Sequence, residues 1–294
     1  MPLPFIKMHG CGNDYVYVDG FRHQVQDPAR LAVRVSDRHK GVGSDGLILV
    51  LPSEKAHVRM RMWNADGSES EMCGNGVRCV AKLAYEEGHA RHDDMRVEVG
   101  RDGKTRVLTL RLIRQGESVT AVTVGMGSPS FVRQDIPMAG EQGVEVLDEQ
   151  IAIPASRDVY TATCVNVGNP HCVIFLDRDP DDALVLGKGP QLETLRVFPA
   201  RMNVEFAHVL SPTEIRLRVW ERGSGETLAC GTGATATVAA AIRTGRIPGP
   251  KALVHLKGGD LDIEWDRTQN QLYMTGPAVT VFRGTYLDGG SAVS

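Results

Sequence analysis

Two cysteines, Cys73 and Cys230, occur in the same local context in the two halves of the chain. Cys73 precedes Gly-Asn-Gly and Cys230 precedes Gly-Thr-Gly, and a segment of helix-forming composition follows each. A cysteine at a helix start faces unpaired N–H groups and the positive end of the helix dipole. These favour the thiolate and lower its pKa below about 8.5, and the same N–H groups can bind a carboxylate.

Two such thiols suit a reaction that removes a proton from one face of a carbon and delivers one to the other. Thiol and thiolate can exchange roles when the direction reverses, and general acid–base catalysis favours a pKa near ambient pH. N–H groups on a substrate carboxylate would stabilise the developing charge. The pair therefore predicts an amino-acid epimerase or racemase without a cofactor, with Cys73 and Cys230 as acid and base.

The remaining cysteines do not share this context. A single cysteine beside glycine is more often a small buried hydrophobe than a catalyst. The sequence has no C-x-x-C pair, and its closest cysteine spacings are six and eight positions, so neither a zinc site nor a redox motif is predicted. We interpret as packing residues Cys11, Cys79, Cys164 and Cys172.

The shared context belongs to an internal duplication. RMRMWNADGSESEMCGNGVRCVAKLAYEEG, from Arg59, aligns without a gap with RLRVWERGSGETLACGTGATATVAAAIRTG, from Arg216. The match extends outward to Gly-Asn at 12–13 and 168–169 and to MGSPSF and MTGPAV near the ends of the halves. Such self-similarity indicates two similar domains. We predict domains over 1–133 and 157–276, a linker region over 134–156, and a tail over 277–294 that returns to the first domain or frays.

Local patterns indicate which elements position the cysteines. Apolar residues alternate with arginines before each cysteine, as in a strand, and a Gly-rich turn and a helical segment follow. Gly88 and Gly245 lie where a helix ends. We predict an α+β fold of two pseudo-symmetric domains, each a strand-rich, barrel-like sheet around one principal helix. The active site is expected in the interdomain cleft.

Composition narrows the class of protein. The 294 residues are 42% hydrophobic and carry a net charge of −3, which gives no reason to expect nucleic acid or a membrane as partner. The N-terminus lacks signal-peptide features, and no apolar run approaches the roughly 20 residues needed to span a bilayer. We expect a cytoplasmic enzyme with a small-molecule substrate, assembled as a homodimer.

Four segments resemble those of diaminopimelate epimerases in order and spacing: KMHGCGNDYVYVD, NADGSESEMCGNGVRCVA, VNVGNPHCVIF and ERGSGETLACGTGATA. The resemblance covers essentially the whole chain. It implies the diaminopimelate epimerase-like fold and interconversion of LL- and meso-diaminopimelate by a two-base mechanism, in lysine and peptidoglycan precursor synthesis. Neither pyridoxal phosphate nor a metal is implied.

The resemblance also implies roles for single residues. Cys73 and Cys230 match the family's catalytic thiols, and His171 and Glu221 match residues that handle the thiol protons, in an order that stays open. Arg222 could grip the distal carboxylate of the substrate bidentately. The matched substrate-binding positions are Asn13, Asn64, Gly74, Asn75, Asn169, Asn203, Glu221, Arg222, Gly231 and Thr232.

The two halves differ where a substrate with one distal group would need asymmetry. Asn64 is equivalent to Glu221, and Tyr15 lies roughly where His171 does. We hypothesise that these differences determine specificity. Some family members carry a glutamine in the GVGSDG segment that contacts substrate, and Gly46 in this chain cannot make that contact.

Two other functions stay open. A racemase of the same fold acting on proline, hydroxyproline or another small amino acid would use the same thiols. Arg222 and the asparagines at 13, 64, 169 and 203 argue against it, because such a substrate has no distal carboxylate. A redox sensor or binding protein would instead close a disulfide between Cys73 and Cys230, which thiol titration with and without reductant would detect.

Overall fold

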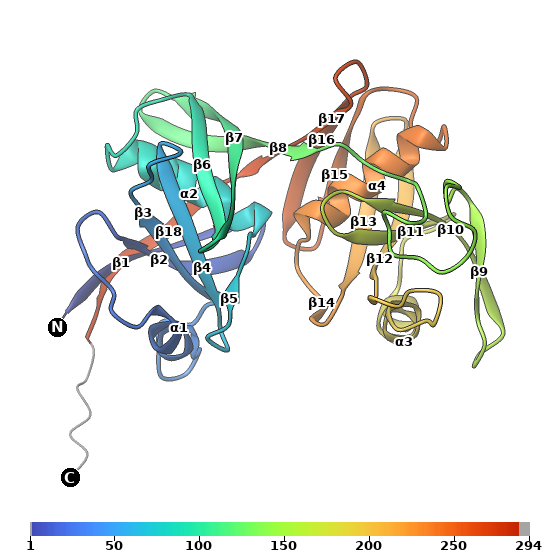
Figure 1. Cartoon of the computed structure of the whole chain (residues 1–294), viewed down its shortest axis with the longest axis horizontal. Helices are drawn as coiled ribbons and strands as arrows, with labels where there is room; N and C mark the ends of the chain where they lie inside the picture. Colours follow the sequence, from blue (N-terminus) through green and yellow to red (C-terminus); the bar gives the residue numbers. More distant parts are fainter. Residues whose placement is uncertain (1, 288–294) are drawn as a thin grey trace, which may run out of the picture. The chain divides into compact units, whose positions relative to one another are not determined.

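The computed structural model describes residues 2–287, which divide into two compact units (Figure 1). Unit 1 comprises residues up to Val124 together with those from Gly276, and unit 2 comprises Gly125–Thr275. No helix in the described part of the chain is long and apolar enough to cross a membrane.

Unit 1 is built on one continuous series of paired strands. Its order is β18-β1-β2-β3-β4-β6-β7-β8, with β2–β3 and β4–β6 parallel and the pairs β18–β1, β1–β2, β3–β4, β6–β7 and β7–β8 antiparallel. Its elements are β1 (Leu3–Gly10), β2 (Asn13–Asp19), α1 (Pro28–Ser36), β3 (Gly46–Leu51), β4 (Val58–Asn64), β5 (Glu69–Ser70), α2 (Gly74–Glu86), β6 (Asp94–Arg101), β7 (Lys104–Gln115), β8 (Ser118–Gly127) and β18 (Val279–Tyr286).

Unit 2 repeats this order and these directions as β9-β10-β11-β12-β13-β15-β16-β17, with β11–β12 and β13–β15 parallel. Its elements are β9 (Glu149–Ile153), β10 (Asp158–Asn166), β11 (Pro170–Leu176), α3 (Asp182–Glu193), β12 (Asn203–Ser211), β13 (Glu214–Glu221), β14 (Gly225–Glu226), α4 (Gly231–Arg243), β15 (Lys251–Leu256), β16 (Gly259–Asp266) and β17 (Gln271–Pro277). The common topology confirms the duplication predicted from sequence.

The principal helix of each unit is buried on every side. In α2 the residues from Asn75 to Tyr85 are all buried, and α4 is buried almost throughout. Helix α2 packs on β1, β2, β3, β4, β6 and β7, so the sheet curves around it (Figure 1). Gly88 and Gly245, just past the helix ends, have φ of +81° and +77°, as predicted for helix-ending glycines. The predicted α+β fold is confirmed.

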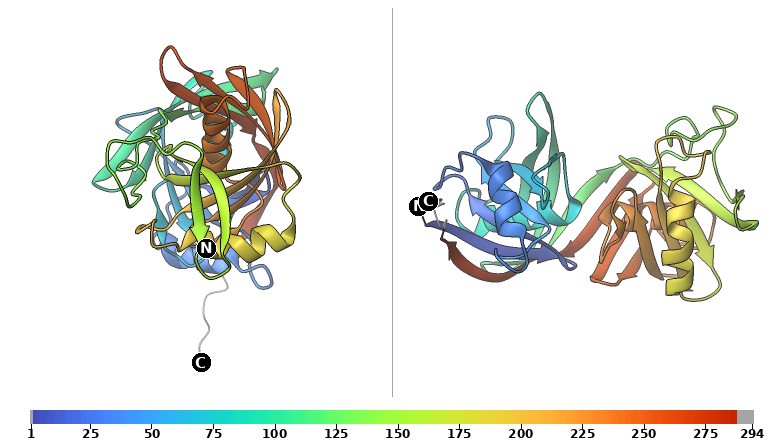
Figure 2. Two further views of the ribbon diagram at one scale, coloured as in Figure 1. Left: turned by 90° about the vertical axis from the view of Figure 1, so that its right-hand side faces the viewer. Right: turned by 90° about the horizontal axis from the view of Figure 1, so that it is seen from below.

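Each unit also has a second helix that the sequence did not predict, α1 or α3, on the other face of the sheet (Figure 2). Helix α3 contains Gly187, Gly189 and Pro190, a composition that disfavours a helix. Tertiary packing overrides it: a Cβ at Gly189 would lie 2.7 Å from the Trp220 ring, so only glycine allows this approach. The Asp181 carboxylate caps the helix by accepting from Leu184 N at 2.8 Å.

The domain bounds differ from those predicted. Residues 134–156 were predicted as a linker because Pro, Gly and acidic residues occur there. Their widely spaced apolar side chains instead join the core of unit 2, and Glu149–Ile153 forms β9. Strand β18 pairs with β1 and holds the place that β9 has in unit 2. Residues 288–294 of the predicted tail lie outside the described residues. The core side chains are Ile136, Met138, Val146, Ile151 and Ile153.

Candidate active site

Cys73 and Cys230 are the N-cap residues of α2 and α4. Each has extended backbone, and its sulfur accepts a hydrogen bond from the N–H of the second glycine that follows. Gly76 N lies 3.4 Å from Cys73 Sγ, and Gly233 N lies 3.3 Å from Cys230 Sγ. The prediction that both cysteines begin helices is confirmed. Each thiol therefore lies beside helix N–H groups that favour negative charge.

The Cys73 thiol donates to Asn13 Oδ1 at 3.1 Å. Asn13 is held in turn by Asp45, whose Oδ2 accepts from Asn13 Nδ2 at 2.7 Å, and Arg38 Nη2 donates to Asp45 Oδ1 at 3.0 Å. Burial, and next the negative charge that Cys73 carries as a thiolate, raise the pKa of Tyr15 far above its ordinary value, so its hydroxyl keeps its proton. Unit 1 thus holds its cysteine with neutral partners.

The Cys230 thiol lies at the end of a longer chain of side chains. Thr232 Oγ1 is 3.4 Å from Cys230 Sγ and accepts from Asn169 Nδ2 at 3.3 Å. Asn169 Oδ1 is 2.8 Å from His171 Nε2, and His171 Nδ1 is 2.7 Å from Glu205 Oε1. A continuous series of polar contacts therefore connects this thiol to a buried carboxyl group.

The pKa of Cys230 differs from the sequence-based prediction. Burial, and next the Glu221 carboxylate, raise it well above the ordinary value, whereas the Thr232 hydroxyl and the Gly233 N–H lower it. The prediction of a lowered pKa is wrong for this cysteine, because the cost of removing a thiolate from water exceeds the gain from the helix start. At neutral pH Cys230 is therefore a thiol, ready to act as an acid.

The segment after β13 carries Glu221 and Arg222. Glu221 Oε1 accepts from the Thr227 hydroxyl. Asn203 is buried, and its amide is used twice within the protein: Oδ1 accepts from Arg222 N at 2.9 Å, and Nδ2 donates to Pro170 O at 2.8 Å. Asn203 therefore fixes the backbone of this segment, while the Arg222 guanidinium is more exposed and donates to Ala200 O at 3.1 Å.

The predicted site residues are divided between the two units, and the residues of each unit are named here as its group. In unit 1, Asn64 ends β4 and its amide donates to Ser68 Oγ at 3.0 Å, and Asn75 accepts from the buried Arg78 at 3.0 Å. The unit 1 group is Asn13, Asn64, Cys73, Gly74 and Asn75, and the unit 2 group is Asn169, His171, Asn203, Glu221, Arg222, Cys230, Gly231 and Thr232.

A family model described as diaminopimelate epimerase matches residues 5–132 and 163–281, which include every one of these positions. The chain belongs to the diaminopimelate epimerase family. It is 51% identical to the diaminopimelate epimerase of Moorella thermoacetica over 285 residues, covering 97% of this chain and 99% of that protein. It is 48% identical to that of Desulfovibrio desulfuricans over 287 residues, covering 97% and 98%.

A solved structure shows the same fold at low identity. A hydroxyproline epimerase from Agrobacterium vitis, with trans-4-hydroxy-L-proline bound, aligns with a TM-score of 0.65 and 18% identity over 98% of this chain and 94% of that one. The likeness extends over both units. It establishes the fold of this diaminopimelate epimerase family member and carries no conclusion about its substrate.

Two buried or partly buried carboxylates of this family member were missed from sequence, Asp45 and Glu205. Asp45 lies in the GVGSDG segment, beside Gly46. Glu205 lies one repeat length of 157 residues after Ile48, so the alignment of the halves shows a carboxyl where the first half has an aliphatic side chain. That mismatch is the signal that could have identified it.

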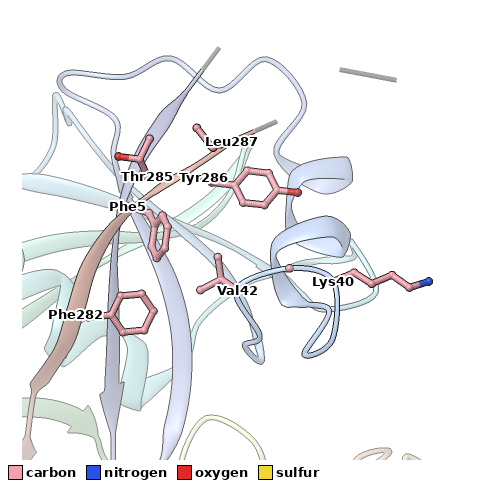
Figure 3. A pocket seen from close by; sticks show the side chains of 8 residues that line it. Phe5, Lys40, Val42, Phe282, Thr285, Tyr286 and Leu287 are labelled. Carbon is pink, nitrogen blue, oxygen red and sulfur yellow. The ribbon is translucent and has the colours of Figure 1, made fainter. Parts of the chain in front are cut away.

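Two further observations concern the structure outside these groups. Within residues 2–287, no three His, Cys, Asp or Glu side chains are grouped so that they could hold a metal ion. Figure 3 shows an open hollow in unit 1 that none of the predicted site residues lines. Its lining residues are Phe5, Lys40, Gly41, Val42, Phe282, Thr285, Tyr286 and Leu287.

Proposed function

We propose that this chain is an isomerase that converts LL-2,6-diaminopimelate to meso-diaminopimelate, with Cys73 and Cys230 as its two acid–base groups. The observation that carries the proposal is the equivalent placement of two thiols as N-caps of α2 and α4 in a chain of the diaminopimelate epimerase family. Neither pyridoxal phosphate nor a metal ion enters the proposed reaction.

In the proposed reaction the thiolate of one cysteine takes the α-hydrogen as a proton. The electrons of the broken C–H bond remain on the α-carbon and are delocalised into its carboxylate. The thiol of the other cysteine then protonates the opposite face, so one proton is taken up, one is delivered and no redox change occurs. The raised pKa of Cys230 makes it the proton donor in one direction and Cys73 the base.

The helix starts supply the groups that would stabilise the developing charge. We assign the N–H groups of Gly74 and Asn75 in α2, and of Gly231 and Thr232 in α4, to the reacting carboxylate, because N–H groups at a helix start bind anions. Such donors act in the transition state without reorganisation.

The distal end of diaminopimelate carries a second ammonium and carboxylate group. We assign that carboxylate to Arg222, whose backbone is fixed by Asn203. The asparagine amides can serve both groups because each has donors and an acceptor. A substrate without a distal carboxylate would leave the Arg222 charge unused. Because their amides have both donors and an acceptor, we propose that Asn13, Asn64 and Asn169 contribute to substrate binding.

Glu221 and His171 both belong to unit 2, where Glu221 acts on the Cys230 thiol through its charge and His171 through Asn169 and Thr232. We propose that both control the proton of Cys230.

Membership of the same family supports the further proposals that the enzyme acts in lysine and peptidoglycan precursor synthesis and that it is cytoplasmic. We also propose that it is a homodimer, which sedimentation of the purified protein would test.

The Glu221→Gln variant is expected to turn over diaminopimelate about 10- to 100-fold more slowly with an intact fold. Removing the carboxylate also removes a group that raises the pKa of Cys230, so this thiol should be alkylated faster at neutral pH. Steady-state kinetics, circular dichroism and alkylation of the Cys230 peptide check these effects. Unchanged turnover would reject the proposed role.

Solvent deuterium incorporation tests the function itself. The reduced protein is incubated with LL-diaminopimelate in D₂O, and the product is analysed by NMR and chiral separation. We expect deuterium at a single α-carbon together with formation of the meso isomer. No incorporation into any diaminopimelate isomer would reject this substrate, and proline and hydroxyproline would be the next compounds assayed.

A further inference from the structure

The duplication places Glu205 at a position built for an aliphatic side chain. Ile48 and Glu205 are the third residues of β3 and β12, and each faces a glycine of the principal helix. A Cβ at Gly76 would lie 2.8 Å from Ile48 Cδ1, and a Cβ at Gly233 would lie 3.0 Å from Glu205 Oε1. The carboxyl group therefore reaches the same place beneath α4 that Ile48 fills beneath α2.

Glu205 shares this buried place with His171. Both side chains are fully buried, and Glu205 Oε2 has no hydrogen-bond partner within residues 2–287. A bare carboxylate is costly in such a place. Burial raises the pKa of Glu205, and the neighbouring His171 opposes this. Asn169 Oδ1 can only accept, so its 2.8 Å contact with His171 Nε2 requires a hydrogen on that nitrogen, and the 2.7 Å contact between His171 Nδ1 and Glu205 Oε1 requires a second one.

His171 Nε2 therefore donates to Asn169 Oδ1 at 2.8 Å. This contact fixes the Asn169 amide, so that its Nδ2 donates to Thr232 Oγ1 at 3.3 Å. With that acceptor site occupied, the Thr232 hydroxyl can turn its own hydrogen toward Cys230 Sγ, 3.4 Å away. Together with the Gly233 N–H at 3.3 Å, it gives the sulfur two donors.

We propose that Glu205 is a positioning residue for the epimerisation: acting through His171 and Asn169, it orients Thr232 as a donor to the Cys230 thiolate. The inference rests on the proposed function, because it assumes that Cys230 gives up its proton during turnover. Unit 1 positions its thiol differently. Ile48, the equivalent of Glu205, cannot bind a proton, and Cys73 is instead held by Asn13, which Asp45 holds in turn. The two thiols are thus tuned by different networks.

The Glu205→Gln variant tests the proposal with a readout that needs no substrate. Iodoacetamide labelling, followed by mass spectrometry of the Cys73 and Cys230 peptides, gives both alkylation rates across pH 6–10. We expect alkylation of Cys230 to slow by about 10-fold at neutral pH, equivalent to about one pKa unit, while Cys73 is unchanged. With diaminopimelate, kcat should fall about 10- to 100-fold, as it does when a group that orients a catalytic residue is lost, with KM nearly constant. Glu221, the other carboxylate acting on Cys230, stays in place in every variant.

Two control variants separate positioning from other effects. In a His171→Asn background, the further change Glu205→Gln should not slow the alkylation of Cys230 any further, because the connecting imidazole is gone. Glu98→Gln removes a different buried glutamate, which accepts from Ser53 in unit 1, and should leave both thiols unaffected.

Two outcomes would overturn the proposal: an unchanged ratio of the two alkylation rates, or faster alkylation of Cys230. Equal slowing of both thiols would indicate a structural role, and faster alkylation of Cys230 a direct charge effect, because the Glu205 carboxylate by itself raises the pKa of Cys230. If the wild-type protein does not epimerise diaminopimelate, the proposed function fails, yet the alkylation ratio still decides whether Glu205 tunes Cys230.

Discussion

Cys73→Ala and Cys230→Ala are each expected to lose at least about 10³-fold in kcat/KM for diaminopimelate epimerisation, about 4 kcal/mol of transition-state stabilisation. Inversion of the α-carbon needs a base on one face and an acid on the other, so neither thiol can replace its counterpart. The loss should appear mainly in kcat, because the helix N–H groups and Arg222 that are proposed to bind the substrate remain. Steady-state rates in both directions measure it.

Cys79→Ala is the matched control for these variants. Cys79 lies in the same helix as Cys73, is fully buried, and has its pKa raised to about 11 by burial. It should remain unreactive, and its replacement should cost about 1 kcal/mol of stability without a change in turnover. Retention of activity within tenfold in either catalytic variant would contradict the two-base reaction.

The sequence alone predicts the parts of this site that depend on local order. A cysteine between a strand and a Gly-rich helix start is a local pattern, and its recurrence after 157 residues made the pair visible. The structure confirms both N-caps and the common topology of the units. Local order also explains why Gly88 and Gly245 were recognised as helix ends.

The parts that were missed depend on neighbours that are distant in the sequence. The role proposed for Glu205 depends on its contact with His171. The parallel pairing of β12 with β11 brings the two side chains together, which no local pattern reveals. Helix α3 forms despite its composition because it packs on β13, where Gly189 allows the Trp220 ring to approach closely. The prediction of a lowered pKa for Cys230 took only the helix start into account. Burial of the thiol, which was left out, has the larger effect and raises this pKa.

The contacts of Asn203 show a similar limit to prediction from the sequence. Its match to a substrate-binding position is visible in the sequence, whereas the use of both ends of its amide by Arg222 N and Pro170 O is visible only in the structure. Its contribution to substrate binding in this chain is therefore proposed to act through the position of Arg222.

Arg78→Met is expected to lower the free energy of unfolding by about 3 kcal/mol or more, the largest loss of stability that we predict. Arg78 is fully buried in α2, and its guanidinium donates to Pro277 O at 3.1 Å, Gly74 O at 3.3 Å and Asn75 Oδ1 at 3.0 Å. Methionine fills much of the same volume and donates to none of them. Each buried acceptor left without a donor costs about 1–3 kcal/mol.

The position of Arg78 in α2 has an equivalent in α4 of unit 2. Thr235, one repeat length after Arg78, donates its hydroxyl to Gly231 O at 2.8 Å, as Arg78 does to Gly74 O. Arg78 additionally reaches Pro277, just before β18 returns to pair with β1. Loss of the guanidinium should therefore loosen both the start of α2 and the entry to β18, and so disturb Cys73 as well as stability.

Urea unfolding measures the effect, with Arg111→Met as control. Arg111 pairs with Asp94 on the surface, and both side chains are largely exposed, so its loss should cost less than about 1 kcal/mol. The alkylation rate of Cys73 should change in Arg78→Met and stay constant in Arg111→Met. Arg78→Met could instead cost less than about 1 kcal/mol of unfolding free energy, as is expected for the control. That result would contradict the prediction and show that the three acceptors find other donors.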